Sequence, residues 1–335
     1  MVSKTSRLRL LVVAAILIAA TNVFSQTSNN DLAPAIKLVN ERRSNEAIAA
    51  LKQALKTNKQ NAAAWYYLGV VHLQLNDFKK ASDAFQEAIK LKLESPANAH
   101  SGYAYALFRR GKFKDGTQEA QKALALDPKN LEALYTLGVI NLRTGNHLEA
   151  VKLADTLISL KPDLAEAHLV KSQALVRFTG DAVLANPGEP KEDRLERYKS
   201  AAAALEKYLE LSPASKDVQL WQNQLESLKF HMGARSGTND LYRPREVTTK
   251  VALIAKPEPQ YTQTARNEQV EGRVVLRCVF ASDGSIKHIL VVEALPFGLT
   301  EVSIAAAKQI RFTPATLNGK PVSMLMQVEY NFSLY

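Results

Sequence analysis

Residues 322–334, VSMLMQVEYNFSL, decide the fold of the C-terminal part of this 335-residue chain. Apolar and polar side chains alternate along the whole stretch, as they do on a β-strand with one buried and one exposed face. The stretch is also long, because strands usually have about 5–6 residues. We therefore expect a strand that extends past its neighbours and leaves backbone groups available to a visiting peptide.

Two further strands and a helix are predicted before this strand. Residues 273–281 (RVVLRCVFA) are rich in β-branched side chains, and Asp283-Gly284 is a dipeptide suited to a two-residue hairpin turn. Residues 286–294 then form the return strand, and residues 299–310 carry the apolar stripe of a helix packed on a sheet. The order predicts a small α+β domain, a three-stranded antiparallel sheet with a helix.

Several short motifs of this region occur in one order: KPEPQY (256–261), VEGRVVLRCVF (270–280), RFTPA (311–315) and NGKPV (318–322). In this order they resemble the C-terminal domain of the energy transducer TonB, over residues 246–335. In that family the domain lies in the periplasm and binds a peptide of an outer-membrane receptor along its last strand. The resemblance implies a peptide-binding edge made of Val322, Met324, Met326, Gln327, Val328, Glu329, Tyr330 and Asn331, with Gln260 and Tyr261 nearby.

The chain departs from a complete transducer in three respects. Thr262 follows Tyr261, where the family usually has proline. No histidine precedes His72, although a transducer has a histidine in its membrane helix. Residues 256–259 (KPEP) are the only Pro-rich element, and at about 3.1 Å per residue they are too short to span a periplasm. Two interpretations stay open: a periplasmic protein-interaction scaffold, and a divergent or accessory membrane-anchored transducer that supports receptor transport.

The N-terminus has the pattern of an export signal, predicted over residues 1–25. Lys4, Arg7 and Arg9 precede an apolar run, and Ser25 is a small residue at the expected cleavage site. The uncharged run over residues 10–24 has 15 residues, fewer than the roughly 20 of a transmembrane helix. We expect cleavage after Ser25 and a periplasmic protein of a Gram-negative cell envelope. An uncleaved anchor in the inner membrane is the alternative.

The middle of the chain repeats with a 34-residue period, which is typical of stacked helix pairs. One unit has its packing residues at the positions used by tetratricopeptide repeats, which this region resembles: Trp65, Leu68, Gly69, Ala81, Phe85 and Ala88. We expect an all-α solenoid over residues 28–230, with repeat units at about 28–61, 62–96, 97–130 and 131–164, and a fifth from residue 165.

Glycine and proline mark two breaks after the fourth unit. Residues 179–193 are predicted to interrupt the fifth unit as a loop, and residues 217–229 to form a closing helix. Residues 231–245 have little apolar periodicity and are predicted to be a linker to the C-terminal domain, residues 246–335.

A peptide groove is predicted on the first helices of the pairs. Arg109, Arg143 and Arg177 recur on these helices at the repeat spacing, and aromatic residues occupy neighbouring positions: Tyr66, Tyr105, Phe108 and Tyr135. Cationic and aromatic side chains together suit an acidic or C-terminal peptide. Arginines near helix ends also bind terminal carbonyl groups, so a solvated helix face is the alternative.

The sequence lacks the common catalytic motifs HExxH, GxSxG and GxxxxGK[ST], and it has no Cys/His cluster with metal spacing. We therefore expect a protein without enzyme activity, cofactor or metal; a cofactor-free hydrolase accessory is the enzyme-class alternative. Removing the signal leaves 40 basic residues (43 less three) against 33 acidic ones, a diffuse +7. The expected partners are proteins or peptides, including an outer-membrane receptor, and neither nucleic acid nor a small-molecule substrate. Membrane contact is expected only if residues 1–25 are retained.

Overall fold

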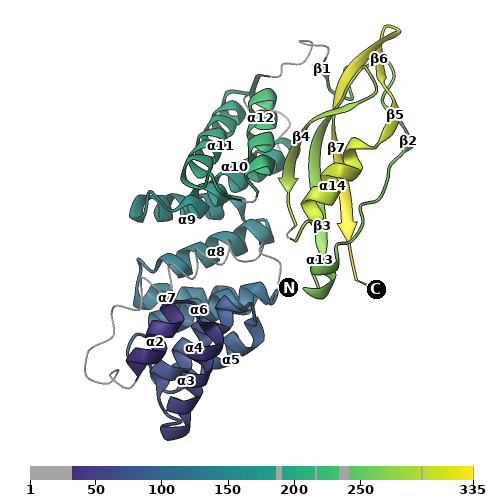
Figure 1. Cartoon of the computed structure of the whole chain (residues 1–335). Coiled ribbons are helices and arrows are strands. Elements are labelled where there is room, and N and C mark those ends of the chain that lie inside the picture. The colour runs from purple at the N-terminus through teal and green to yellow at the C-terminus, as the bar shows by residue number, and fades with distance from the viewer. Residues whose placement is uncertain (1–31, 186–190, 216, 234–240, 296, 335) are drawn as a thin grey trace. The chain divides into compact units, whose positions relative to one another are not determined.

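A computed structural model describes residues 32–185, 191–215, 217–233, 241–295 and 297–334 (Figure 1). The chain divides after Ala174 into two compact units. Helices fill the first unit, and the second combines helices with a strand-rich C-terminal domain. This arrangement confirms the predicted fold class, an all-α repeat solenoid followed by an α+β domain. The predicted export signal lies outside the described residues.

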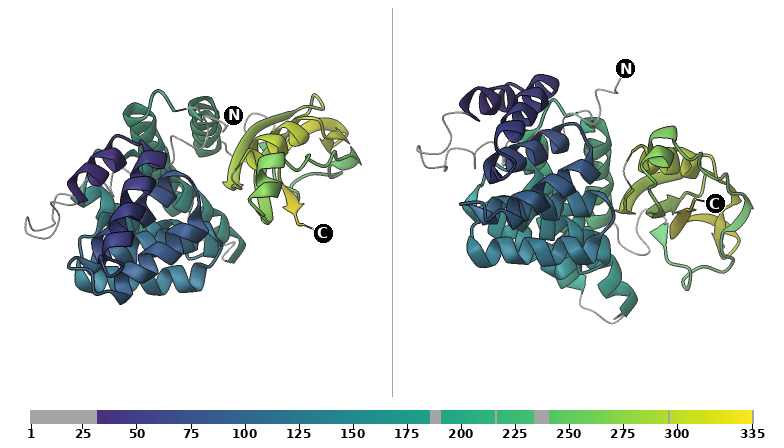
Figure 2. Two further views of the ribbon diagram at one scale, coloured as in Figure 1. Left: turned by 60° about the horizontal axis from the view of Figure 1, so that its bottom comes forward. Right: turned by 90° about the horizontal axis from the view of Figure 1, so that it is seen from below.

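The first unit is a series of helix pairs (Figure 2). The pairs are α2 (Ala33–Asn40) with α3 (Ser44–Thr57), α4 (Ala62–Gln74) with α5 (Phe78–Lys90), α6 (Pro96–Arg109) with α7 (Phe113–Leu126), and α8 (Leu131–Thr144) with α9 (His147–Leu160). Each pair falls in one of the repeat units that the 34-residue period predicts.

Caps and small residues explain why these helices form and pack. The side chains of Asn61 and Asp77 accept hydrogen bonds from backbone N–H groups three residues on, at 3.0 and 3.1 Å, and so start α4 and α5. A Cβ at Gly69 or Gly102 would lie 2.8 or 2.6 Å from the ring of Phe85. Glycine at both positions therefore lets α4 and α6 close on the aromatic ring that α5 places between them.

Three long helices continue the repeat pattern: α10 (Ala165–Ala185), α11 (Lys191–Leu211) and α12 (Val218–Gly233). The rings of Tyr208 and Trp221 pack edge to face between α11 and α12, with centroids 6.3 Å apart. The predicted loop over residues 179–193 is wrong at both ends, since α10 runs to Ala185 and α11 begins at Lys191. A single helix-interior glycine such as Gly180 costs only about 1 kcal/mol, which the rest of α10 offsets.

The C-terminal domain is built on a sheet of order β1-β7-β3-β4. Its strands are β1 (Leu241–Tyr242), β3 (Gly272–Phe280), β4 (Ile286–Glu293) and β7 (Lys320–Phe332), with β6 (Ala315–Leu317) paired to β7; β2 (Ala252–Ala255) and β5 (Arg311–Thr313) form a second, two-stranded sheet. The antiparallel β7-β3-β4 core is the predicted three-stranded sheet. Helix α14 (Leu299–Lys308) covers one face of this core, and the short α13 (Gln263–Asn267) precedes β3 (Figure 1).

The alternation predicted for the last strand is confirmed. Met324, Val328, Tyr330 and Phe332 are buried under α14 or its flanking core, whereas Gln327 and Asn331 are exposed. Cys278 on β3 is a buried free thiol, and burial raises its pKa to about 12.

Two predicted connections differ in detail. The β3–β4 loop comprises residues 282–284 rather than two residues, because Ala281 N–H donates to the Ser285 carbonyl (2.9 Å) and Gly284 takes a positive φ of 83°. Of the predicted linker 231–245, residues 231–233 extend α12 and residues 241–242 form β1. Residues 234–240 lie outside the described part of the chain.

Candidate peptide-binding edge

Strand β7 is paired along the whole of one side and along only part of the other. On its inner side β3 pairs with it from Met324 to Phe332 without a break in register. Strand β6 pairs with residues 320–322, and on the outer side β1 pairs in parallel with Ser323 and Met324. Among the described residues, no strand pairs with the outer side beyond Met324. We call residues 325–332 of β7 the open edge.

Alternation along the strand determines which main-chain groups the open edge presents. The Glu329 carbonyl accepts a hydrogen bond from Lys256 Nζ at 2.8 Å, so it points away from β3. Ser323, which pairs with Leu241 of β1, lies in the same phase. Because alternate residues direct their N–H and C=O groups to the same side, Leu325, Gln327 and Asn331 also present theirs outward. An extended peptide could use this ladder as a template.

The segment 256–262 flanks the open edge. The Lys256 ammonium lies 4.6 Å from the centroid of the Tyr330 ring and 3.7 Å from a carboxylate oxygen of Glu258. The Tyr261 ring packs edge to face on Phe332 at 5.5 Å, and its hydroxyl donates to the Val270 carbonyl. Tyr261 therefore packs against the end of β7, and its hydroxyl has a hydrogen-bond partner within the domain.

Thr262 has a structural explanation at the position where the family usually has proline. Its hydroxyl oxygen accepts a hydrogen bond from Ala265 N–H at 3.1 Å, which caps α13. The same hydroxyl donates to the Phe297 carbonyl at 2.7 Å, which connects α13 to the loop before α14. Threonine thus fixes the chain direction here through hydrogen bonds that proline lacks.

The structure narrows the set of edge residues predicted from the sequence. Val322 pairs with β6 and Met324 with β1, so the chain's own strands occupy their positions. The side chains of Val328 and Tyr330 are buried in the core, and that of Met326 is half-buried. Gln327, Glu329 and Asn331 remain as accessible members, and Gln260 is exposed beside Tyr261. Sequence periodicity could not find β1, which is only two residues long.

The predicted groove residues divide into two groups. Phe108, Arg109, Tyr135 and Arg143 are partly exposed on α6 and α8, and Tyr105, 5% exposed, holds Arg109 through a 3.1 Å hydrogen bond from the guanidinium to its hydroxyl. The Arg109 guanidinium also lies 4.1 Å from the centroid of Phe78. These residues form a partly exposed cationic and aromatic surface on α6 and α8.

Tyr66 and Arg177 do not line a groove. Tyr66 is fully buried, with its ring against Tyr67 and Phe85 at 5.3 and 5.8 Å, because this position of α4 faces the neighbouring helices. Arg177 is 5% exposed in the second unit, where its Nε donates to the Val292 carbonyl of β4 at 2.8 Å. The predicted three-arginine ladder is therefore reduced to Arg109 and Arg143.

A buried carboxyl that the sequence analysis missed lies between two repeats. Glu132 on α8 is 4% exposed and accepts a hydrogen bond from the Ser101 hydroxyl of α6 at 2.7 Å. Burial raises the pKa of Glu132 to about 8, although the bond from Ser101 lowers it. Asn130 donates to the side chain of Asn98 at 3.2 Å beside it. This network joins consecutive first helices and has a structural role.

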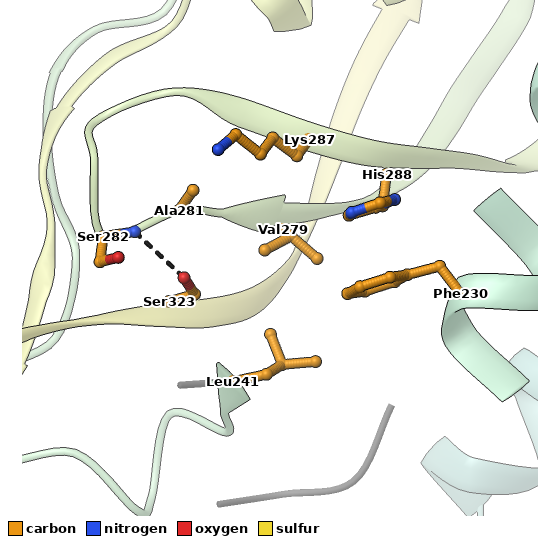
Figure 3. A pocket seen from close by; sticks show the side chains of 8 residues that line it. All are labelled: Phe230, Leu241, Val279, Ala281, Ser282, Lys287, His288 and Ser323. Carbon is orange, nitrogen blue, oxygen red and sulfur yellow. Dashed lines mark hydrogen bonds between the residues drawn. The ribbon is translucent and has the colours of Figure 1, made fainter. Parts of the chain in front are cut away.

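A pocket of about 180 Å³ lies in the second unit (Figure 3). Its lining residues are Phe230, Leu241, Val279, Ala281, Ser282, Lys287, His288 and Ser323. Several of these groups are engaged within the protein: Ser282 N–H donates to Ser323 Oγ, Lys287 pairs with Asp283, and the His288 ring stacks on Phe230 with centroids 3.5 Å apart.

The described residues hold neither a candidate membrane span nor a candidate metal site. No helix among them combines the length and apolar character needed to cross a membrane. Within the same ranges, no three His, Cys, Asp or Glu residues are grouped so that they could hold a metal ion.

Comparisons with known proteins agree with this division of the chain. Residues 20–168 match the family model of the cytochrome c-type biogenesis protein H TPR domain, and residues 257–334 match that of the Gram-negative bacterial TonB protein C-terminal domain. The chain thus joins a tetratricopeptide-repeat domain to a TonB C-terminal domain, and both predicted resemblances are confirmed.

Individual relatives resemble only part of the chain. The cytochrome c-type biogenesis protein CycH of Rhizobium meliloti (strain 1021) is 32% identical over 139 residues, which cover 39% of this chain and 36% of CycH. The formate-dependent nitrite reductase complex subunit NrfG of Escherichia coli O157:H7 is 26% identical over 143 residues, 42% of this chain and 72% of NrfG. The human Superkiller complex protein 3 is 28% identical over 53% of this chain, but the match spans only 11% of that protein.

A solved structure also shows partial similarity. The type IV pilus biogenesis factor PilW has 21% sequence identity and a TM-score of 0.48, over 62% of this chain and 87% of PilW. Together, the two family matches and the bacterial relatives support a protein-interaction role in the bacterial cell envelope.

Proposed function

We propose that this chain is a periplasmic scaffold that binds one partner protein on its repeat array and captures an extended peptide of an outer-membrane protein on β7. The observation that carries the proposal is the open edge, a long strand of a TonB C-terminal domain whose outward main-chain groups beyond Met324 have no strand partner among the described residues. The ladder of outward main-chain groups suits main-chain pairing.

Capture proceeds by strand addition. A peptide that pairs with the outward groups of Leu325, Gln327, Glu329 and Asn331 gains hydrogen bonds worth about 0.5–1.5 kcal/mol each in net terms. Lys256 has to release the Glu329 carbonyl, which it holds at 2.8 Å. Because the bonds are to the main chain, specificity depends on the side chains of the peptide that meet the rim around Gln327 and Asn331.

Amide hydrogen exchange of the full chain tests the capture. Synthetic peptides from the periplasmic segments of outer-membrane receptors should slow exchange at Gln327, Glu329 and Asn331, because these N–H groups point outward beyond the residues that pair with β1. The alternate residues, already bonded to β3, should not change. Peptides with N-methyl groups at every second residue are the matched control. Absence of added protection with every peptide, in a folded chain, would refute capture at this edge.

The repeat array is the second half of the scaffold. Arg109 and Arg143, with Tyr105, Phe108 and Tyr135, present charge and aromatic surface for an acidic or C-terminal peptide. The relatives that match the chain are named as a cytochrome c-type biogenesis protein and a nitrite reductase complex subunit. By analogy, we assign to the array the binding of a protein component of an envelope complex.

Replacing both Arg109 and Arg143 with alanine tests the groove. At about 0.5–1 kcal/mol per partly exposed charge, we expect roughly five- to thirty-fold weaker binding of an acidic peptide. Arg110→Ala is the control, because Arg110 is exposed at the end of the same helix. Unfolding curves of each variant separate lost binding from lost stability, since Arg109 also packs on Phe78. Equal affinity of the double variant and the control would assign the arginines to structure alone.

The anchored transducer is the alternative that the export signal leaves open. N-terminal sequencing of the protein from its own cells should find Gln26 as the first residue, because the short apolar run favours cleavage. A protein that still begins at Met1 and needs detergent for extraction would favour the membrane-anchored transducer instead.

A further inference from the structure

Strand β4 forms the opposite edge of the same sheet, and side chains from helices meet its main-chain groups. Gln224 of α12 makes two of these contacts. Its Nε2 donates to the Ile289 carbonyl at 3.1 Å, and its Oε1 accepts from Val291 N–H at 2.5 Å. A glutamine amide carries one donor side and one acceptor side, as a peptide group does. Gln224 therefore takes the place of a neighbouring strand.

Two other side chains extend this contact along β4. Arg177 Nε of α10 donates to the Val292 carbonyl at 2.8 Å. His231 Nε2 of α12 lies 3.1 Å from the His288 carbonyl, to which it donates as the neutral tautomer. The His288 ring stacks on Phe230 with centroids 3.5 Å apart and planes 3° from parallel. Helix α12 lies alongside β4 over this length (Figure 1).

The side chains that contact β4 from the helices are themselves buried. Gln224 is 4% exposed and Arg177 is 5% exposed. A buried amide without hydrogen bonds would cost about 1–3 kcal/mol, so Gln224 is compatible with folding only when β4 is in place. On α11, Tyr198 receives a further bond from Arg277 of β3. Polar residues of three helices thus depend on the sheet.

We infer that helices α10–α12 are a built-in cap for the β4 edge. The cap closes this edge to strand addition by a peptide or by a second copy of the chain, and it leaves β7 as the side where the sheet can grow. The C-terminal functional unit consequently begins within α10, near residue 175, and the last repeat serves the sheet instead of the peptide groove. This inference does not depend on what binds β7.

The test uses the full chain with Gln224→Met and Arg177→Met, which keep side-chain bulk but remove the hydrogen bonds. Gln219→Met, on the exposed side of α12, is the control. We expect exchange of the Val291 amide to rise about tenfold or more in the double variant, because its acceptor is lost, while amides in the β3–β7 ladder stay protected. We also expect concentration-dependent self-association in analytical ultracentrifugation.

Each remaining outcome counts against the cap. Unchanged exchange at Val291 in a folded double variant would show that Gln224 does not hold the edge. Faster exchange with a strictly monomeric protein would show that the edge needs no cap against strand addition. If the double variant does not fold, Gln224→Glu is measured instead, since it keeps an acceptor for Val291 N–H but loses the donor to Ile289. Faster exchange at β4 and association are then expected, and a monomer with wild-type exchange overturns the inference.

Discussion

The two edges of the C-terminal sheet satisfy their main-chain groups in different ways. At β4, buried Gln224 and Arg177 project from helices and hold three groups at 2.5 to 3.1 Å. At β7, Lys256 binds the Glu329 carbonyl of the open edge, and its side chain is 34% exposed. One edge is closed by buried side chains, whereas an accessible ammonium meets the other edge.

This difference implies different energies of opening. Breaking the β4 contacts leaves buried polar groups without partners, at a cost of about 1–3 kcal/mol for each. Releasing Lys256 returns an exposed ammonium to water, which costs about 1 kcal/mol or less. The sheet is therefore expected to accept a partner strand at β7 far more readily than at β4.

The largest predicted effect comes from proline at the open edge. Gln327→Pro removes an outward N–H and its ring clashes with a pairing strand, so the two effects together should weaken peptide capture by roughly 100-fold or more while the β3 ladder stays paired. Val328→Pro is the matched variant, because the N–H of Val328 faces β3, and it should unfold the domain. Peptide titration and thermal unfolding of both variants check this. Wild-type affinity in Gln327→Pro would mean that capture does not use the main chain of β7.

The second prediction is that the stability of the two edges depends differently on pH. Burial, and then the charge of Arg277, lower the pKa of His231 to about 4, and burial and Lys287 lower the pKa of His288. The folded state thus favours neutral imidazoles, whereas the unfolded chain binds protons near pH 6.5. The stability contributed by these histidines is present above about pH 6.5 and is lost as the pH falls toward 4.

We therefore expect amide exchange along β4 to quicken between pH 6.5 and 4, after correction for the intrinsic rate, while the open edge of β7 does not follow. His231→Gln keeps a donor for the His288 carbonyl and removes the titrating group, so it should flatten most of the pH dependence. An equal response of both edges would place the titrating groups elsewhere.

Sequence periodicity predicted individual helices and strands, and it missed contacts between residues that are far apart in the chain. The alternation of β7 and the apolar stripe of α14 identified both elements, because each pattern repeats within a few residues. Arg177 was assigned to the groove from its spacing, yet it binds a carbonyl 115 residues away, and no local pattern encodes such a contact. Tyr66 lies on the first helix of its pair, as the groove residues do on theirs, but its position around the helix axis buries it.

The smallest predicted effect concerns Lys256. It measures how strongly the ammonium competes with a peptide for the open edge. If the ammonium only competes with a peptide for the Glu329 carbonyl, Lys256→Met should tighten peptide binding by about two- to five-fold, because the competing bond is worth about 1 kcal/mol or less. The free energy of unfolding should change by no more than that amount. Lys250→Met is the control, since Lys250 is an exposed lysine before β2. Calorimetric titration of the three proteins with one peptide measures the difference. Weaker binding by Lys256→Met would instead mean that the ammonium contacts the peptide, and the β7 edge would then be a charged site rather than a lightly covered ladder.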